Sequence, residues 1–327
     1  MKRRYFILIF LSAIMGIGLY FWIRETGIYY DFRSFDHYKE AAVHNAPAKQ
    51  LPFKPFEKRE ESAVQFFAVG CAGSGNKGQK MLAESMAKVA AVYRPDFILY
   101  LGDNFYGRGL DSINDPQWQN KFEQIYDPKI LSMPFYAVLG NHDYFRNPEA
   151  QIAYSEKSSR WRMPARYYSF QHSLASGTQI EFYALDTVML LSGKGKNQLK
   201  WLEENLKSSK AAWKIVYGHH PVHSGAYTYL KQIRKMQQLL EPVLIRYKVD
   251  LYLSAHNHSI EVFKEISGVT YIVSGAGSRP RNVRWTDQTN FAYADIGFAW
   301  FRIFEREMEF YVVGHDGQIV FNLRIIK

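Results

Sequence analysis

The sequence predicts an α/β protein with the layers of a four-layer α-β-β-α sandwich. From residue 64 to residue 254, short apolar segments alternate with amphipathic ones, a pattern typical of strand–helix–strand units and a largely parallel sheet. Strand-like segments then follow one another without a helix, which indicates a second, more antiparallel sheet. If each sheet carries helices on one side only, the two bare sides are expected to pack together.

The first half of the domain supplies the alternating units. An apolar run that ends at a glycine predicts a strand, and apolar residues at helical spacing predict a helix. In chain order the sequence predicts a strand at 64–70, a helix at 78–93, a strand at 96–102, a helix at 116–126, a strand at 135–140, a helix at 149–158 and strands at 166–172 and 179–186.

The second half begins in the same way and ends in strands. A helix is expected at 197–206, a strand at 213–218 and a helical stretch at 229–247, which Pro242 interrupts because proline lacks the backbone N–H of a helix interior. The remaining strands are expected at 250–254, 260–264, 270–274, 297–305, 308–314 and 318–325. The aromatic content of 16% also favours a core rich in strands.

Length and composition indicate one large domain behind a leader. The chain has 327 residues, of which 47% are hydrophobic and 22% charged, values that exclude a disordered protein. The net charge of +10 attracts anions such as phosphate esters, but the chain has no long basic run, so we expect no nucleic-acid partner. The single cysteine excludes an intramolecular disulfide. We expect a leader at 1–24, a tether at 25–62 and a monomeric domain at 63–327.

The leader has the pattern of a membrane anchor. Lys2, Arg3 and Arg4 precede the uncharged residues 5–23, a length that spans a bilayer core of about 30 Å. Basic residues on this side favour a cytoplasmic N-terminus and export of the rest of the chain. A cleaved signal peptide is the alternative, but no small-residue cleavage site follows Ile23. We therefore expect a membrane-anchored protein with its domain on the periplasmic or extracellular side.

Polar side chains of the kinds that bind metals follow five of the predicted strands. Since ligands bind at the carboxyl ends of strands in open α/β sheets, these side chains are expected to form one site. Each cluster alone also fits a turn or a surface pair, whereas the whole set in this order favours a metal site. The residues are Cys71, Asp103, Tyr106, Asn141, His142, His219, His220, His256 and His258.

These segments resemble the purple acid phosphatases, a group within the calcineurin-like metallophosphoesterases, and above all the small tartrate-resistant acid phosphatases. The family pattern is D-x-G, G-D-x-x-Y, G-N-H-[DE], G-H and G-H-x-H. The similarity extends from residue 64 to residue 325. The matching segments are Cys71-Ala72-Gly73, Gly102-Asp103-Asn104-Phe105-Tyr106, Gly140-Asn141-His142-Asp143, Gly218-His219 and Ala255-His256-Asn257-His258.

The resemblance implies a hydrolase with two metal ions, and it assigns the ligands by position. Asp103 would bridge the two metals. The first metal, iron(III) in the family, would be held by Cys71, Tyr106 as tyrosinate, and His258. The second, a divalent iron, zinc or manganese, would be held by Asn141, His219 and His256.

The reaction implied is hydrolysis of a small phosphate monoester. Two cations lower the pKa of a water for attack on phosphorus, and they neutralise the phosphate oxygens. The leaving alkoxide needs a proton, for which the candidates are His142, His220 and His223. The family has a further histidine where this chain has Thr228. A phosphodiesterase or nucleotide hydrolase on the same scaffold is the alternative.

Two departures from the family affect the site. Cys71 stands where the family has its first aspartate. As a thiolate it would supply the same charge to the metal and favour zinc or iron(II); as a neutral buried thiol it would leave the first metal weakly held and the enzyme impaired. In addition, the segment 188–196 is shorter than the covering loop of the mammalian enzymes, which predicts a more open site.

Overall fold

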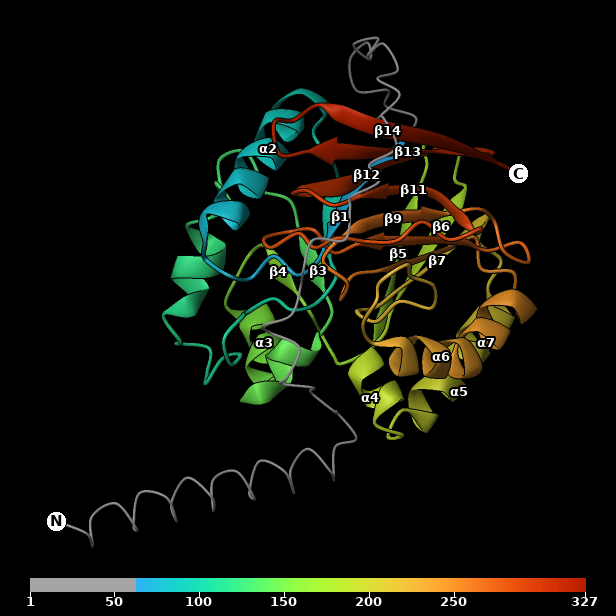
Figure 1. Cartoon of the computed structure of the whole chain (residues 1–327), viewed down its shortest axis with the longest axis horizontal. Coiled ribbons are helices and arrows are strands. Elements are labelled where there is room, and N and C mark those ends of the chain that lie inside the picture. The colour runs from blue at the N-terminus through green and yellow to red at the C-terminus, as the bar shows by residue number, and fades with distance from the viewer. Residues whose placement is uncertain (1–62) are drawn as a thin grey trace, which may run out of the picture.

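Two seven-stranded sheets form the centre of the protein (Figure 1), in a computed structural model that describes residues 63–327. The first sheet has the order β14-β13-β12-β1-β2-β3-β4 and the second β11-β9-β10-β8-β7-β6-β5. Both sheets are mixed rather than one parallel and one antiparallel. The expectation of two sheets flanked by helices is therefore confirmed, with the antiparallel strands shared between them.

The first sheet has a parallel half and an antiparallel half. Strands β1 to β4 run parallel, and β12 continues the sheet antiparallel on the other side of β1. Its strands are β1 (Val64–Val69), β2 (Phe97–Tyr100), β3 (Phe135–Ala137), β4 (Trp161–Arg162), β12 (Gly297–Ile303), β13 (Glu307–Gly314) and β14 (Ile319–Ile326).

The second sheet has four parallel strands at its centre and antiparallel strands at both edges. The parallel strands are β6 (Gln179–Ala184), β7 (Trp213–Tyr217), β8 (Leu251–Ser254) and β10 (Thr270–Ser274). The antiparallel strands are β5 (Tyr168–Ser173), β9 (Ile260–Phe263) and β11 (Thr289–Tyr293).

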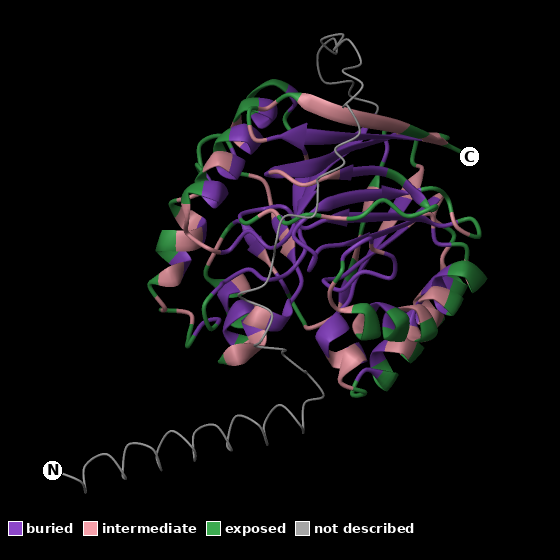
Figure 2. Ribbon diagram, viewed as in Figure 1, coloured by how far each residue is buried: buried purple, intermediate pink, exposed green. Residues whose placement is uncertain are grey.

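Helices lie on the outside of the molecule in two groups (Figure 1). Figure 2 shows that their exposed residues face away from the sheets, whose central strands are buried. On the first sheet's side lie α2 (Lys77–Tyr93) and α3 (Glu149–Ala153), and on the second sheet's side lie α4 (Thr187–Leu191), α5 (Lys196–Ser208), α6 (Leu230–Leu239) and α7 (Glu241–Arg246).

Several elements differ from those expected. The predicted helix at 116–126 is helical over residues 117–123, of which Gln119–Glu123 form a π-helical turn. The helical stretch at 229–247 divides at Leu240, so that Pro242 lies in the first turn of α7, where no N–H partner is required. Strands β4 and β11 and helix α4 were not expected, since two- to five-residue segments carry little periodicity.

Aromatic rings join the two sheets. The ring of Phe182 on β6 lies edge-on to Phe66 on β1 and to Phe97 on β2, with centroids 5.5 and 5.2 Å apart. Each such pair contributes about 0.5–1.5 kcal/mol beyond the area it buries. These contacts pack the two sheets against each other in the core between them.

No helix of residues 63–327 is both long and apolar enough to cross a membrane. The predicted anchor or signal segment at 1–24 and the tether at 25–62 lie outside the described residues.

Candidate metal centre

Loops from both sheets bring the predicted ligands together. Cys71, Asp103 and Asn141 follow β1, β2 and β3 of the first sheet, while His219 follows β7 and His256 follows β8 of the second. All of these side chains are buried, as are Tyr106 and His258. The site therefore lies where the carboxyl ends of the parallel strands of the two sheets meet.

Three of the predicted ligands have a left-handed backbone. The φ angles are 53° at Cys71, 55° at Asp103 and 62° at His256, in a region that costs an L-residue about 1 kcal/mol or more. A cluster of such residues is a mark of functional sites. The backbone contacts between Cys71 N and Gly102 O, 2.9 Å, and between Ala255 N and His219 O, 2.9 Å, hold these turns in place.

The first donor group consists of Cys71, Asp103 and His258, whose ligand atoms all lie within 4.8 Å of one another. Tyr106 completes it, since its hydroxyl donates to Asp103 Oδ2 at 3.0 Å and lies 3.1 Å from His258 Nε2. The carbonyl of Arg279 accepts from His258 Nδ1 at 2.7 Å. His258 Nε2 is therefore left without a proton, facing the group, which is the state a metal requires.

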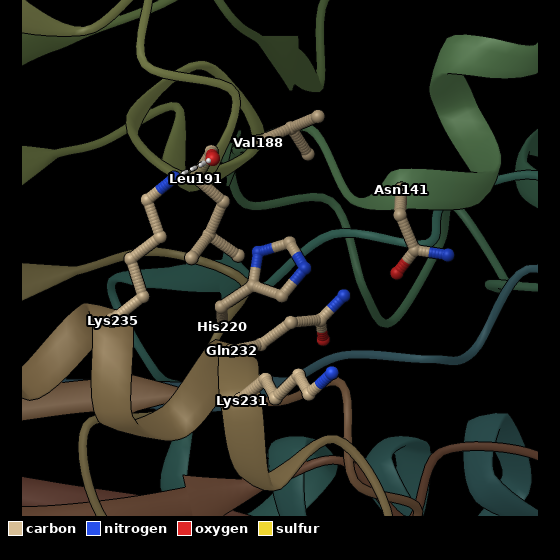
Figure 3. A pocket seen from close by; sticks show the side chains of 7 residues that line it. All are labelled: Asn141, Val188, Leu191, His220, Lys231, Gln232 and Lys235. Carbon is tan, nitrogen blue, oxygen red and sulfur yellow. Dashed lines mark hydrogen bonds between the residues drawn. The ribbon is translucent and has the colours of Figure 1, made fainter. Parts of the chain in front are cut away.

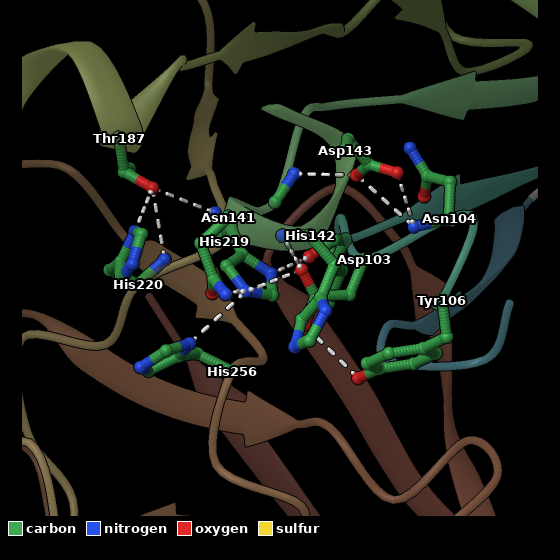
Figure 4. Close-up of polar contacts among 12 residues, drawn as sticks. Asp103, Asn104, Tyr106, Asn141, His142, Asp143, Thr187, His219, His220 and His256 are labelled. Atoms are coloured by element: carbon green, nitrogen blue, oxygen red, sulfur yellow. Dashed lines mark hydrogen bonds and ion pairs between the residues drawn. The ribbon is translucent and has the colours of Figure 1, made fainter. Parts of the chain in front are cut away.

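The second donor group is built around His219 and His256, with His220 close by. Leu101 O accepts from His219 Nδ1 at 2.8 Å, so His219 Nε2 faces inward, 3.1 Å from Asn141 Oδ1 and 3.4 Å from Asp103 Oδ1 (Figure 4). Gln232 Oε1 lies 3.0 Å from His256 Nε2 and accepts its proton. His256 Nδ1 then faces His219 Nε2 at 3.2 Å.

This arrangement requires an added positive charge, either a metal ion or a proton on His219 Nε2. With both imidazoles neutral, His219 Nε2, His256 Nδ1 and Asp103 Oδ1 present lone pairs to one another with no proton between them. An added positive charge would satisfy all three. Because Asp103 turns one oxygen to each donor group, its carboxylate occupies the position of a bridging ligand.

The electrostatics of the site agree with this fit. Burial raises the pKa of Asp103, but His219, His142 and His256 outweigh it and hold that pKa well below its usual range. Burial lowers the pKa of His219, but Asp103, together with the Leu101 carbonyl and Asp143, outweighs burial and raises that pKa. Asp103 thus remains a carboxylate and favours a positive charge at His219 Nε2. In the absence of metal, that charge is a proton on the imidazole.

The other histidines of the site are kept neutral. Burial, together with neighbouring histidines, drives the pKa of His256 well below its ordinary value, and burial and Arg281 lower that of His258 to about 4. A neutral imidazole is the form that binds a metal, so both side chains are ready to act as ligands at neutral pH.

Cys71 lies inside the first donor group and is fully buried. Burial and the charge of Asp103 raise the pKa of its thiol well above the ordinary value, which describes a neutral thiol without metal. A cation beside the sulfur would reverse this effect and favour the thiolate. Both interpretations of Cys71 are compatible with its position.

The three predicted proton donors differ in their surroundings. The ring of His142 lies tilted against that of Tyr106, with centroids 4.6 Å apart, and the backbone N–H of His142 donates to Asp103 Oδ1. The hydroxyl of Thr187 accepts the backbone N–H groups of His219 and His220, so it donates its own hydrogen to His220 Nδ1, which accepts it at 2.8 Å. The Nε2 of His220 therefore carries a proton it can donate.

His223 lies apart from these residues. Its Nε2 is 2.6 Å from Glu241 on α7, and its ring contacts Phe263 and Tyr271 on β9 and β10. These contacts explain the buried position of His223 without a role in proton transfer, and they offer no support for the prediction that it is a donor.

Sequence reasoning did not identify two residues that position ligands. Gln232 fixes His256 from α6, although nothing in its sequence surroundings distinguishes it. Asp143 accepts the backbone N–H groups of Gly140, Asn104 and Phe105 and so joins two ligand-bearing loops. Asp143 does belong to the G-N-H-D motif, which was a usable signal.

A hollow open to solvent, with a volume of about 110 Å³, adjoins the second donor group (Figure 3). Asn141 and His220 form the wall that it shares with the site, and helices α4 and α6 form the rest. Its lining residues are Asn141, Val188, Leu191, His220, Lys231, Gln232 and Lys235.

With this geometry established, comparison with known proteins identifies the family. The family model described as calcineurin-like phosphoesterase matches residues 66–259. The chain belongs to the calcineurin-like phosphoesterases. Among these it is similar to tartrate-resistant acid phosphatase type 5 of Oryctolagus cuniculus, with 30% identity over 84% of this chain and 94% of that relative. It is also similar to purple acid phosphatase 7 of Arabidopsis thaliana, with 30% identity over 69% of this chain and 73% of that one.

The resemblance to purple acid phosphatases predicted from the motifs is thereby confirmed, and this calcineurin-like phosphoesterase is a hydrolase of the acid phosphatase group. Among solved structures, GAP50, described as the anchor in the inner membrane complex of Plasmodium, matches with a TM-score of 0.73 and 25% identity over 81% of this chain and 90% of that one.

Proposed function

We propose that this protein hydrolyses phosphate monoesters at a centre of two metal ions bridged by Asp103. The observation that supports the proposal is the position of that carboxylate, with Oδ2 3.0 Å from the Tyr106 hydroxyl and Oδ1 3.4 Å from His219 Nε2. One buried carboxylate shared between two donor groups is the arrangement that a pair of cations requires.

The donor sets suggest a different cation on each side. Cys71, Tyr106 and His258 would hold the first metal with Asp103, and Asn141, His219 and His256 would hold the second. We propose iron for the first position and iron, zinc or manganese for the second. Bound there, the two cations would supply an activated water and neutralise the charge of the phosphate.

The residues around the metals then divide the remaining tasks. Leu101, Gln232 and Arg279 fix the histidine tautomers so that each ligand nitrogen points inward. The leaving oxygen needs a proton, and His220 Nε2 is a donor that Thr187 keeps in the correct tautomer. His142, beside Tyr106, is the second candidate for this transfer.

The test compares Asp103→Asn with the control Asp127→Asn, which removes a carboxylate from the exposed loop before β3. With p-nitrophenyl phosphate as substrate, Asp103→Asn is expected to lower activity at least 100-fold, because one bridging ligand would hold both cations. Removal of a single electrostatic group from an active site lowers kcat by a factor on the order of 10²–10³. The control should retain activity. Equal activity in both variants contradicts the proposal.

The bis(p-nitrophenyl) ester distinguishes the two hydrolytic alternatives. We expect the monoester to be the better substrate, and faster hydrolysis of the diester would indicate a phosphodiesterase. A role without catalysis, such as the anchoring role stated for GAP50, is favoured only by Cys71. Less than one equivalent of metal in the purified protein, together with no hydrolysis of either ester, would support that role.

A further inference from the structure

The hollow beside the second donor group has a basic wall and an apolar wall. Lys231 and Lys235 lie one turn apart on α6, and Val188 and Leu191 lie opposite on α4. None of the described residues that line the hollow is acidic. Asn141 and His220 form the remaining wall, which separates the hollow from the metal ligands.

The two lysines are not equivalent. Lys235 donates to the carbonyl of Leu191 at 2.7 Å, which joins α6 to the end of α4. Lys231 is exposed, and no carboxylate within residues 63–327 forms an ion pair with it. In Figure 3 its ammonium group points into the hollow, beside the amide of Gln232 and toward Asn141. Lys231 is therefore the cation available to a bound molecule.

Lys231 also lies where a helix tolerates positive charge poorly. It is the second residue of α6, and the first turn of this helix contains no acidic residue. A cation at the positive end of a helix dipole is unfavourable by itself, whereas an anion there is favoured. The adjacent residue, Gln232, contacts His256 Nε2 at 3.0 Å, so the backbone that carries Lys231 lies next to the predicted metal ligands.

We infer that Lys231 selects phosphate monoesters whose alcohol part carries a second anionic group, either a carboxylate or another phosphate, on a short carbon chain. This inference rests on the proposed function. The phosphate to be cleaved lies at the metals, the chain lies along Val188 and Leu191, and the second anion binds the Lys231 ammonium. His220, on the shared wall, faces the leaving oxygen between the two anions.

The experiment measures three esters with wild-type protein and with Lys231→Met. The esters are 3-hydroxypropyl phosphate, its carboxylate counterpart 3-(phosphonooxy)propanoate, and propane-1,3-diyl bisphosphate. We expect Lys231→Met to lower kcat/KM by about tenfold for the two esters with a second anion. A change of this size corresponds to the loss of one hydrogen bond to a charged group that is partly screened by solvent. The value for 3-hydroxypropyl phosphate, which has no second anionic group, should change by less than twofold. Comparison of the carboxylate ester with the bisphosphate identifies which anion fits better.

The control is Lys200→Met, which removes the same charge from an exposed site on α5. Lys200→Met should leave the preference for the second anion intact. If the two variants behave alike, the preference comes from net charge and the inference is wrong.

Binding separates this inference from the proposed function. Dissociation constants of butylphosphonate and 4-phosphonobutanoate, measured by calorimetry on the metal-loaded protein, need no turnover. The expected result is tighter binding of 4-phosphonobutanoate by about tenfold, lost in Lys231→Met. Equal binding of the two phosphonates overturns the inference even if p-nitrophenyl phosphate is hydrolysed. A retained preference without any hydrolysis would overturn the proposed function alone.

Discussion

At the scale of single residues, the site depends on which atoms carry protons. The carbonyls of Leu101 and Arg279 accept the Nδ1 protons of His219 and His258, so both rings turn Nε2, the nitrogen that would bind a metal, toward Asp103 or Tyr106. Cys71 is the one ligand position whose chemistry differs from that of the relatives' motif. Its left-handed backbone is a conformation that aspartate adopts more readily than most residues.

Changing Cys71 to aspartate tests the role of this position. Because the backbone already suits aspartate and the carboxylate needs no thiol deprotonation, Cys71→Asp is expected to bind iron more tightly and to gain a visible tyrosinate-to-iron band from Tyr106. Metal analysis and absorption spectra of the purified variant measure both effects, with Cys71→Ala as the control that has no ligand there. Loss of metal from Cys71→Asp would instead identify the thiolate as the native ligand.

Metal binding should release protons. Asp103 raises the pKa of His219, so the metal-free protein holds a proton on His219 below that pKa, and a metal must displace it. The thiol of Cys71, with its raised pKa, would release a second. Affinity for zinc is therefore expected to fall as pH falls. Titrations of metal-free protein in two buffers of different ionisation enthalpy count the protons, and a count of zero contradicts this account.

At the scale of elements, the loops that carry the ligands approach one another so closely that there is no room between them for a Cβ atom. A Cβ on Gly140 would lie 2.2 Å from the backbone nitrogen of Asp103 and 2.3 Å from its Oδ1. The glycine that begins the G-N-H-D motif thus lets the loops after β2 and β3 touch. Close contacts of the same kind occur at Gly70, Gly102 and Gly218, which precede three of the other polar clusters, whereas Ala255 takes this place before His256.

Gly140→Ala is expected to displace Asp103 and so to reduce metal content and activity together. Overpacking of this kind costs about 1–3 kcal/mol of folding stability, which thermal unfolding would detect. Gly177→Ala is the comparison, since a Cβ there meets nothing within 4 Å and only the φ of 85° is strained. Full metal content in Gly140→Ala would show that the loops can move apart without loss of the site.

At the scale of the whole molecule, the sequence predicted that there are two sheets and where most strands lie along the chain, because these features follow from apolar periodicity and from motifs at strand ends. It did not predict that both sheets are mixed, since the pairing of distant strands is set by tertiary contacts. It did not predict β4, β11 or α4, which are stabilised by tertiary contacts. Nor did it identify Gln232, because a residue that positions a ligand from a neighbouring helix leaves no local signal. The predicted anchor at 5–23 remains a prediction.

The packing of the two sheets should dominate stability. Phe182 is fully buried and contacts rings from both sheets, namely Phe66, Phe97 and Phe170. Phe182→Ala is expected to lower the free energy of unfolding by about 3–5 kcal/mol, measured by urea denaturation. Val92→Ala, on the exposed face of α2, should change it by less than about 0.5 kcal/mol. A small effect of Phe182→Ala would mean that the sheets are held together elsewhere.

Anomalous X-ray diffraction from crystals of metal-loaded protein tests the central claim most directly. The account predicts two peaks about 3.5–4 Å apart, one on each side of the Asp103 carboxylate, with His258 on one metal and His219 and His256 on the other. A single peak, or a pair of peaks that Asp103 does not bridge, would contradict it.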